Sequence, residues 1–314
     1  MSVKNIIGIT GASGFLGGYL CDRLPFPQKR LSRQQQTACS FDSQWCLGDI
    51  ENTADIQRFI QDIPTLIHLA CQGYPQRSNH AFIHAIQHNL LPSAQLFEAF
   101  ARANANGHLI FSSTGGNMYD ASQPAQIQTE DSLPCPQSSY SIHKLAEEHY
   151  LRLLCKKYGI RATILRISNP YGILLPKDRG QGIIGVALNN ILSGEPLPIF
   201  DSLQSVRDYI HLDDVTHAFR LVLENPPESG ECRLFHVSSG IGYSLEHVLE
   251  LLEQKAQCPL KRALHPSLPS PSYSVLSYQK IQTALGWSPQ INLELGIEQM
   301  IQQISQRATA GLNG

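Results

Sequence analysis

The clearest chemical signal in this chain is the sequence Ser139-Tyr140-Ser141-Ile142-His143-Lys144. On a helix, Tyr140 and Lys144 would lie one turn apart on the same face. A lysine ammonium beside a phenol favours the phenolate and lowers a pKa that is about 10 when unperturbed. The pair therefore predicts that Tyr140 acts as a base near neutral pH. A tyrosine and a lysine four residues apart also occur by chance on many helices, so the pair needs support from elsewhere in the chain.

A second signal is the run of hydroxyl side chains Ser112-Ser113-Thr114, which is followed by Gly115-Gly116. The run ends an apolar segment, at what we expect to be the carboxyl end of a strand, where open parallel sheets bind ligands. A hydroxyl at this point could hydrogen-bond the same substrate oxygen that Tyr140 deprotonates. The alternative is a Ser/Thr turn that satisfies its own backbone.

A third signal is a set of glycines spaced three apart, Gly11, Gly14 and Gly17, directly after a β-branched segment. Gly11 can adopt a positive φ, Gly14 lets the backbone approach a phosphate, and Gly17 lets the next helix pack tightly on the strand. The N-terminus of that helix offers free N–H groups to an anion. The pattern predicts a dinucleotide site, and the alternative is a glycine-rich turn without a ligand.

The elements that would position these residues alternate between strands and helices. The expected strands are 6–10, 28–33, 45–50, 65–70, 108–112 and 161–167, and the expected helices begin at 15 and 53 and cover 79–103 and 139–158. Pro92 is expected to break or kink the third of these helices. Such alternation implies right-handed βαβ units, and therefore a doubly wound parallel sheet, the Rossmann α/β fold.

After Ser168 the alternation lapses until about Ser205, and glycine and proline become frequent. A helix at 207–224 and a strand at 234–237 are expected to return to the sheet, and three further helices should follow, the first at 244–256. We expect a Rossmann domain formed by residues 1–167 and 207–240. Residues 168–206 and 241–314 should form a smaller C-terminal substrate-binding domain.

Composition excludes several classes of function. The 314 residues include 42% hydrophobic and 16% charged residues, and the net charge of −2 gives no reason to expect nucleic acid or an anionic membrane as partner. The eight cysteines are scattered, without a C-x-x-C pair or zinc-ligand spacing, so no metal site is expected. No apolar run reaches the roughly 18 residues of a membrane span, and the N-terminus does not read as a signal peptide. We expect a soluble, cytoplasmic protein.

In their order along the chain, the glycine loop, the hydroxyl cluster and the Tyr-x-x-x-Lys pair resemble the extended short-chain dehydrogenase/reductase family, in its sugar-nucleotide epimerase/dehydratase branch. The resemblance covers nearly the whole chain. It is carried further by Gly48-Asp49-Ile50, His68-Leu69-Ala70, Asn89, residues 166–172 and residues 206–211.

The resemblance implies a role for each matching residue. Tyr140 would be the acid/base, Lys144 would hold the nicotinamide ribose and tune Tyr140, and Thr114 or Ser113 would hydrogen-bond the reacting oxygen. The cofactor, NAD or NADP, would be bound by Gly11, Ser13, Gly14, Phe15, Leu16, Ser32, Arg33, Asp49, Ile50, Leu69, Ala70, Cys71, Asn89, Ser112, Tyr140, Lys144 and Ser168. The substrate, a nucleotide sugar, would be bound by Thr114, Asn169, Gln181, Ile184, Phe200 and Arg207. A homodimer through the helices near 80–103 and 139–158 is also implied.

Three departures from the family pattern narrow the function. Arg33 stands where members that prefer NAD usually carry an acid, and an arginine there suits the 2′-phosphate of NADP. Gly115-Gly116 replaces the Asp-Glu pair of the dehydratases, so elimination of water is disfavoured. Asp201 replaces a usual glycine, and residues 266–272 lack the usual arginine and aspartate, which puts a standard UDP-hexose in doubt.

We therefore expect an NAD(P)-dependent sugar-nucleotide epimerase. The alternative is an NADP-dependent reductase of a keto-sugar nucleotide or another carbonyl compound. A non-catalytic cofactor-binding regulator is a third hypothesis, and the intact set of Tyr140, Lys144 and Thr114 argues against it.

Overall fold

The computed structural model describes residues 6–34, 43–72, 82–122, 125–174, 182–266 and 272–311. The chain divides into two compact units, here called unit 1 and unit 2. Unit 1 consists of Met1–Met118, Pro134–Arg166 and Ala218–Phe235, and unit 2 of Tyr119–Leu133, Ile167–His217 and His236–Gly314. Residues 119–133, 207–217 and 236–240 thus group with unit 2, whereas they were expected in the Rossmann part. The boundaries of functional domains remain a prediction.

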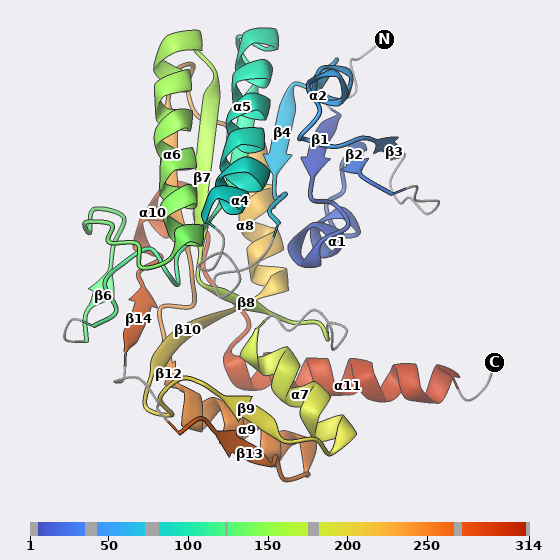
Figure 1. The fold of residues 1–314 in the computed structure, drawn as a ribbon, viewed down its shortest axis with the longest axis vertical. Coiled ribbons are helices and arrows are strands. Elements are labelled where there is room, and N and C mark those ends of the chain that lie inside the picture. Colours follow the sequence, from blue (N-terminus) through green and yellow to red (C-terminus); the bar gives the residue numbers. More distant parts are fainter. Residues whose placement is uncertain are drawn as a thin grey trace. The chain divides into compact units, whose positions relative to one another are not determined.

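A seven-stranded sheet forms the framework of unit 1 (Figure 1), in the order β11-β7-β5-β4-β1-β2-β3. The pairs that join β1 to β2 and β4, β2 to β3, and β4 to β5 are all parallel. The chain proceeds outward from β1 in one direction and then in the other, so the order reverses between β1 and β4, where such sheets bind ligands. The predicted doubly wound Rossmann fold is confirmed. The strands are β1 (Ile7–Thr10), β2 (Gln28–Ser32), β3 (Gln44–Leu47), β4 (Thr65–His68), β5 (His108–Thr114), β7 (Arg161–Ile167) and β11 (Cys232–Val237).

The helices of unit 1 bury one apolar face against this sheet. Helices α2, α5 and α6 share a core with β4 and β5 that includes Phe59, Phe100 and Leu154, and α5 packs against both α2 and α6. Among all described helices of the chain, none is both long and apolar enough to cross a membrane. The helices that contribute to unit 1 are α1 (Phe15–Cys21), α2 (Thr53–Ile60), α4 (Phe82–Ala85), η1 (Ile86–Leu90), α5 (Leu91–Ala103), α6 (Ser139–Tyr158) and α8 (Leu212–Glu224).

Helix α6 has both of its ends fixed by local chemistry. The side chain of Ser138 accepts a hydrogen bond from the backbone N–H of Ser141, and the Ser141 side chain caps Ser138 in return, which forms a capping box. At the other end Gly159 adopts a φ of +74°, the left-handed conformation that terminates helices and that glycine adopts without strain. The helix therefore begins and ends at the predicted residues.

The expected interruption near Pro92 takes the form of a π-helical turn. The turn η1 lies between α4 and α5, and its last bond runs from the Leu91 N–H to the carbonyl of Ile86, five residues earlier. Pro92 has no N–H to offer to the carbonyl of His88, so the α-helical pattern cannot run unbroken through this point. The predicted long helix over 79–103 is therefore three shorter elements within its described part.

Unit 2 contains a short mixed sheet and a separate core. Strands β12, β10, β14 and β6 are adjacent in that order, β8 pairs with β10, and β13 pairs with β9. The core joins α7, α9 and α11 through residues such as Leu188, Leu249 and Ile297. The elements are β6 (Ile127–Gln128), β8 (Asn169–Tyr171), α7 (Ile183–Ser193), β9 (Leu197–Ile199), β10 (Val206–His211), β12 (Gly242–Ser244), α9 (Leu245–Ala256), β13 (Arg262–Leu264), β14 (Tyr273–Leu276), α10 (Gln279–Leu285) and α11 (Leu293–Gly311).

One sequence-based expectation, a helix over 207–224, was wrong. The expected helix over 207–224 is a strand, β10, followed by the helix α8, because Arg207 to His211 pair with residues from β8, β12 and β14. The stretch after Ser168, where the strand–helix alternation was expected to lapse, contains the helix α7, whose apolar residues fill the core of unit 2.

Candidate active site

The glycine loop is shaped by contacts that exclude side chains. Gly11 has a φ of +71°, and a Cβ there would lie 2.6 Å from the backbone nitrogen of Ala70. A Cβ on Gly17 would collide with the carbonyl oxygen of Gly11, so the third glycine packs against the first rather than against the strand. The Gly14 N–H donates to the Gly11 carbonyl at 2.9 Å, and Ser13 and Gly14 are exposed. The loop therefore presents backbone at an open surface, as a dinucleotide phosphate requires.

The end of β4 lies beside this loop. The pairing of Thr10 with His68 aligns the two strand ends. The backbone N–H groups of Leu69 and Ala70 donate to the Thr10 carbonyl at 3.2 Å and to the Thr10 hydroxyl at 3.4 Å. The structure thus brings together three predicted cofactor residues, Gly11, Leu69 and Ala70.

Asn89, on the π turn, is used to hold the next part of the same loop. Its Oδ1 accepts from the Gln72 N–H at 2.6 Å, and its Nδ2 donates to the Gln72 carbonyl at 3.0 Å. This bidentate contact fixes the backbone that follows Cys71. The amide of Asn89 therefore supports this loop, and its role in binding the cofactor stays a prediction.

The remaining cofactor candidates of unit 1 lie at the ends of β2 and β3. Ser32 is the last residue of β2 and pairs with Leu47, the last residue of β3. Arg33 follows directly and is exposed. The backbone N–H of Asp49 donates to the Asp55 carboxylate at 3.0 Å, which shapes the turn after β3. Since β1 to β4 are parallel, these residues lie at the same edge of the sheet as the glycine loop.

The three hydroxyls at the end of β5 have different surroundings. Side chains alternate along a strand, so Ser113 points to the opposite face from Ser112 and Thr114. Ser113 Oγ donates to Glu148 Oε1 at 2.6 Å and is committed to that contact. The Thr114 hydroxyl makes no hydrogen bond with any residue that the structure describes. Of the two residues left open by the sequence, Thr114 is the one with a hydroxyl available to a ligand.

A buried ion pair that the sequence analysis missed anchors α6 to the sheet. The Arg166 guanidinium on β7 binds Glu148 on α6 through two hydrogen bonds, of 2.9 and 2.7 Å, and both side chains are buried. Together with Ser113, this contact connects α6 to two strands. The ion pair and the Ser113 hydrogen bond thus hold in place the helix that carries Tyr140 and Lys144.

Tyr140 and Lys144 lie on the same face of α6, as their spacing predicts. Lys144 Nζ lies 5.9 Å from the centroid of the Tyr140 ring and 4.5 Å from that of Phe111. Lys144 lowers the pKa of Tyr140, as expected, but a larger effect opposes it. Burial raises the pKa of Tyr140 to about 12, and this effect exceeds the opposing effect of Lys144.

Glu147 is a second functional candidate that the sequence analysis missed. Its carboxylate lies 3.5 Å from Lys144 Nζ, and both side chains are almost fully buried. Burial lowers the pKa of Lys144, but the combined effect of Glu147, Cys71 and Tyr140 is larger and raises it. The available signal was its helical spacing, three residues after Lys144 on the same face.

The predicted substrate residues that the structure describes, apart from Thr114, belong to unit 2. Asn169 donates its side-chain N–H to the Asp208 carbonyl at 2.7 Å, and Ser168, a cofactor candidate, donates to the Asp208 carboxylate at 3.1 Å. Ile184 is buried in the core of unit 2, so its side chain packs rather than faces solvent. Phe200 is exposed, with its ring 5.5 Å from that of His265. Gln181 lies outside the described residues.

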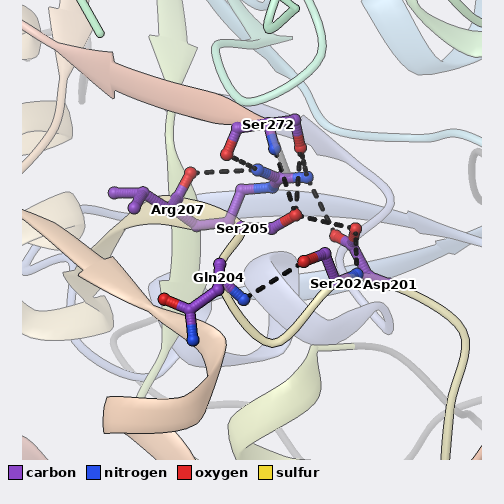
Figure 2. A network of polar contacts seen from close by, with 7 residues as sticks. Asp201, Ser202, Gln204, Ser205, Arg207 and Ser272 are labelled. Atoms are coloured by element: carbon purple, nitrogen blue, oxygen red, sulfur yellow. Dashed lines mark hydrogen bonds and ion pairs between the residues drawn. The ribbon is translucent and has the colours of Figure 1, made fainter. Parts of the chain in front are cut away.

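Arg207, the last substrate candidate, is enclosed by a polar network (Figure 2). Its guanidinium contacts the carboxylate of Asp201 and the backbone and side-chain oxygens of Ser272. Asp201 is thus an ion-pair partner and not simply a replacement for glycine. Within the described ranges, no group of three His, Cys, Asp or Glu side chains could hold a metal ion.

Comparison with known proteins agrees with this architecture. A model of the "NAD dependent epimerase/dehydratase family" matches residues 7–237. The dTDP-4-dehydro-6-deoxyglucose reductase of Escherichia coli is 29% identical over 96% of this chain and 98% of its own. The UDP-glucose 4-epimerase of Thermotoga maritima, solved with UDP-glucose, is 25% identical with a TM-score of 0.87 over 96% of this chain and 99% of its own. That of Thermus thermophilus, solved with NAD, is 25% identical with a TM-score of 0.85 over the same shares. The chain belongs to the NAD dependent epimerase/dehydratase family.

Proposed function

We propose that this protein is an NAD(P)-dependent epimerase of a nucleotide sugar. The observation that carries the proposal is the arrangement of Tyr140 and Lys144 on one face of α6. The hydroxyl of Thr114, to which no described residue binds, lies at the end of β5. Membership of the family supports an enzyme over a non-catalytic regulator.

The residues divide into two groups of roles. The open glycine loop, with Leu69 and Ala70 beside it, would bind the cofactor, which when bound supplies the acceptor and donor of a hydride. Tyr140 would take the proton of a substrate hydroxyl, and Thr114 would hydrogen-bond the same oxygen. Lys144 would hold the nicotinamide ribose and favour the phenolate of Tyr140. Return of the hydride to the other face of the ketone would invert the stereocentre.

The substrate class is inferred from relatives and from unit 2. The Thermotoga enzyme was solved with UDP-glucose, which supports a nucleotide sugar here. Asn169, Phe200 and Arg207 would contact it, together with Gln181 and the backbone near Ile184. A cytoplasmic location remains part of the proposal.

A homodimer is also part of the proposal. Helix α6 exposes Ile142, Tyr150 and Leu153, which share one face of the helix, and the neighbouring α4 exposes Phe82 and Ile83. Apolar side chains of this size gathered on adjacent helices favour contact with a second copy of the chain.

An NADP-dependent reductase is the second candidate. It is favoured by Arg33, which is exposed directly after β2 where an acid would favour NAD. The 29% identity to the E. coli reductase also supports it. The same Tyr140, Lys144 and Thr114 would then act in one direction.

Release of nucleotide from freshly purified, denatured protein separates the two candidates. Bound NAD or NADH, together with interconversion of UDP-glucose or another nucleotide sugar without added cofactor, is the result expected of an epimerase. An empty site that binds NADPH, with consumption of NADPH by a keto-sugar nucleotide, would establish the reductase instead. Tyr140→Phe should abolish either activity. Binding of neither cofactor would overturn both.

Arg33→Asp tests the basis of the second candidate. If Arg33 binds a 2′-phosphate, the substitution should weaken NADP binding by more than about tenfold and leave NAD binding nearly unchanged. Equal weakening of both would contradict the assignment.

A further inference from the structure

The terminal nitrogens of Arg207 have no N–H group left for a new ligand. Nη1 donates to the backbone carbonyls of Val206 at 2.9 Å and of Ser272 at 3.1 Å. Nη2 donates to Asp201 Oδ2 at 3.0 Å and to Ser272 Oγ at 2.7 Å. An arginine carries two N–H groups on each terminal nitrogen, so all four are used. Figure 2 shows Asp201 and Ser272 on either side of the guanidinium, joined to it by dashed lines.

The carboxylate of Asp201 is itself held in place. Its Oδ1 accepts from the Ser202 N–H and from Ser205 Oγ, both at 2.8 Å, while Oδ2 faces Arg207. Ser205 is almost fully buried, and it also accepts a hydrogen bond from the Ser272 N–H at 3.2 Å. Two segments of unit 2, residues 201–207 and the segment that carries Ser272, therefore fix the acid opposite the arginine (Figure 2).

A phosphate would compete with this arrangement. A diphosphate is bound best by a guanidinium that offers two parallel N–H groups and an uncompensated positive charge. To bind through both N–H groups of a terminal nitrogen, or through two parallel N–H groups that include one, a phosphate would have to displace Asp201 or Ser272 from Arg207. It would then lie beside a carboxylate of the same sign, which opposes binding.

We propose that Asp201 is a specificity-determining residue that weakens the hold of Arg207 on a nucleoside diphosphate. The inference rests on the proposed assignment of Arg207 to the substrate. The Asp201–Arg207 pair makes the surroundings of Arg207 close to neutral. Affinity for the substrate would then depend less on its diphosphate and more on its nucleoside and sugar.

Calorimetric titration with UDP tests the proposal directly. Asp201→Asn keeps the size of the side chain and an oxygen for Ser202 and Ser205, but removes the charge. It should bind UDP about tenfold more tightly than the unaltered protein. Equal or weaker binding by the variant, including no measurable binding by either protein, would overturn the proposal. Asp201→Gly, which removes the side chain entirely, should show the same gain in UDP affinity. This second variant shows that the gain does not come from a local distortion by the new asparagine amide.

Two further variants make the result specific. In Asp201→Asn combined with Arg207→Met the gain should vanish, and a gain that survives would overturn the proposal. Glu231→Gln is the matched control, because Glu231 pairs with Arg233 at 2.9 Å in unit 1 and the pair is about as exposed as Asp201 and Arg207. It should leave UDP affinity unchanged, and a similar gain there would also overturn the proposal.

The outcome is separable from that of the proposed function. UDP binding requires no turnover, so a gain in Asp201→Asn would support the role of Asp201 even if no epimerisation were observed. Epimerisation without such a gain would support the proposed function and overturn the role of Asp201.

Discussion

Lys144 Nζ lies 3.5 Å from Oε2 of Glu147, one helical turn along α6, and both side chains are almost fully excluded from solvent. Within the described part of the chain, Oε2 of Glu147 has no hydrogen bond. When ionised, the Glu147 carboxylate partly neutralises the positive charge of Lys144, on which Tyr140 depends as the candidate base. Burial has the largest effect on the pKa of Tyr140 and raises it, Lys144 lowers it, and negative charge on Cys71 or Glu147 raises it.

Glu147→Gln should shift the pH dependence of catalysis. Without the carboxylate, the full charge of Lys144 acts on Tyr140, so the pKa of Tyr140 falls. The acid limb of the kcat/KM profile should move to lower pH, measured as initial rates across the pH range. A limb that stays in place or moves upward would contradict the coupling. Glu98→Gln, which alters an exposed glutamate on α5, should leave the limb unchanged.

Loss of the hydroxyl should lower the catalytic rate at Thr114 and the stability of the fold at Ser113. Thr114→Val removes a hydrogen bond to the reacting oxygen and should lower kcat by about 100-fold with little effect on folding. Ser113→Ala removes a donor to the buried Glu148 and should lower the free energy of unfolding by about 1–2 kcal/mol while kcat changes little. Initial rates and urea unfolding of both variants provide the measurement. A larger loss of kcat in Ser113→Ala would reverse the assignment.

His108 should make the folded state sensitive to acid. Burial, aided by Arg161 and Arg233, lowers the pKa of His108 to about 3, whereas an unfolded histidine titrates near 6.5. Its contribution to stability is therefore fully present above pH 6.5 and is lost as the pH falls toward 3. Between pH 7.5 and pH 5 the unaltered protein should lose about 2 kcal/mol of unfolding free energy relative to His108→Gln.

Urea unfolding at the two pH values measures this difference. His149→Gln, on the exposed side of α6, is the control and should track the unaltered protein. Equal pH dependence of His108→Gln and the unaltered protein would show that His108 is not held neutral by the fold.

Leu153→Glu should dissociate the proposed dimer. Leu153 is exposed on α6, and a charge at the centre of an apolar interface has no partner there. Light scattering after size-exclusion chromatography should give the mass of one chain for this variant and of two for the unaltered protein. Leu192→Glu, equally exposed on α7 in unit 2, should leave the mass unchanged. A single-chain mass for the unaltered protein would remove the proposal.

Local chemistry in the sequence determined the framework of unit 1. The glycine spacing of 11–17 fits a turn that only glycines can form, because Gly11 has a positive φ and Gly17 contacts its carbonyl. Ser138 and Gly159 set the ends of α6, and short apolar runs gave the strands of the parallel sheet. These features depend on neighbours within a few residues, so the sequence alone sufficed for them and for the face shared by Tyr140 and Lys144.

Long-range contacts decided the rest. Residues 207–211 form a strand because partners from β8, β12 and β14 complete their hydrogen bonds, although the sequence around them suggested a helix. Burial in the folded protein raised the pKa of Tyr140, and Glu148 distinguished Ser113 from Thr114. Arg207 meets Ser272, 65 residues away, and this contact is part of the network that uses all four of its terminal N–H groups. Desolvation and pairing between segments far apart in the chain leave no local pattern, so only the tertiary structure could reveal them.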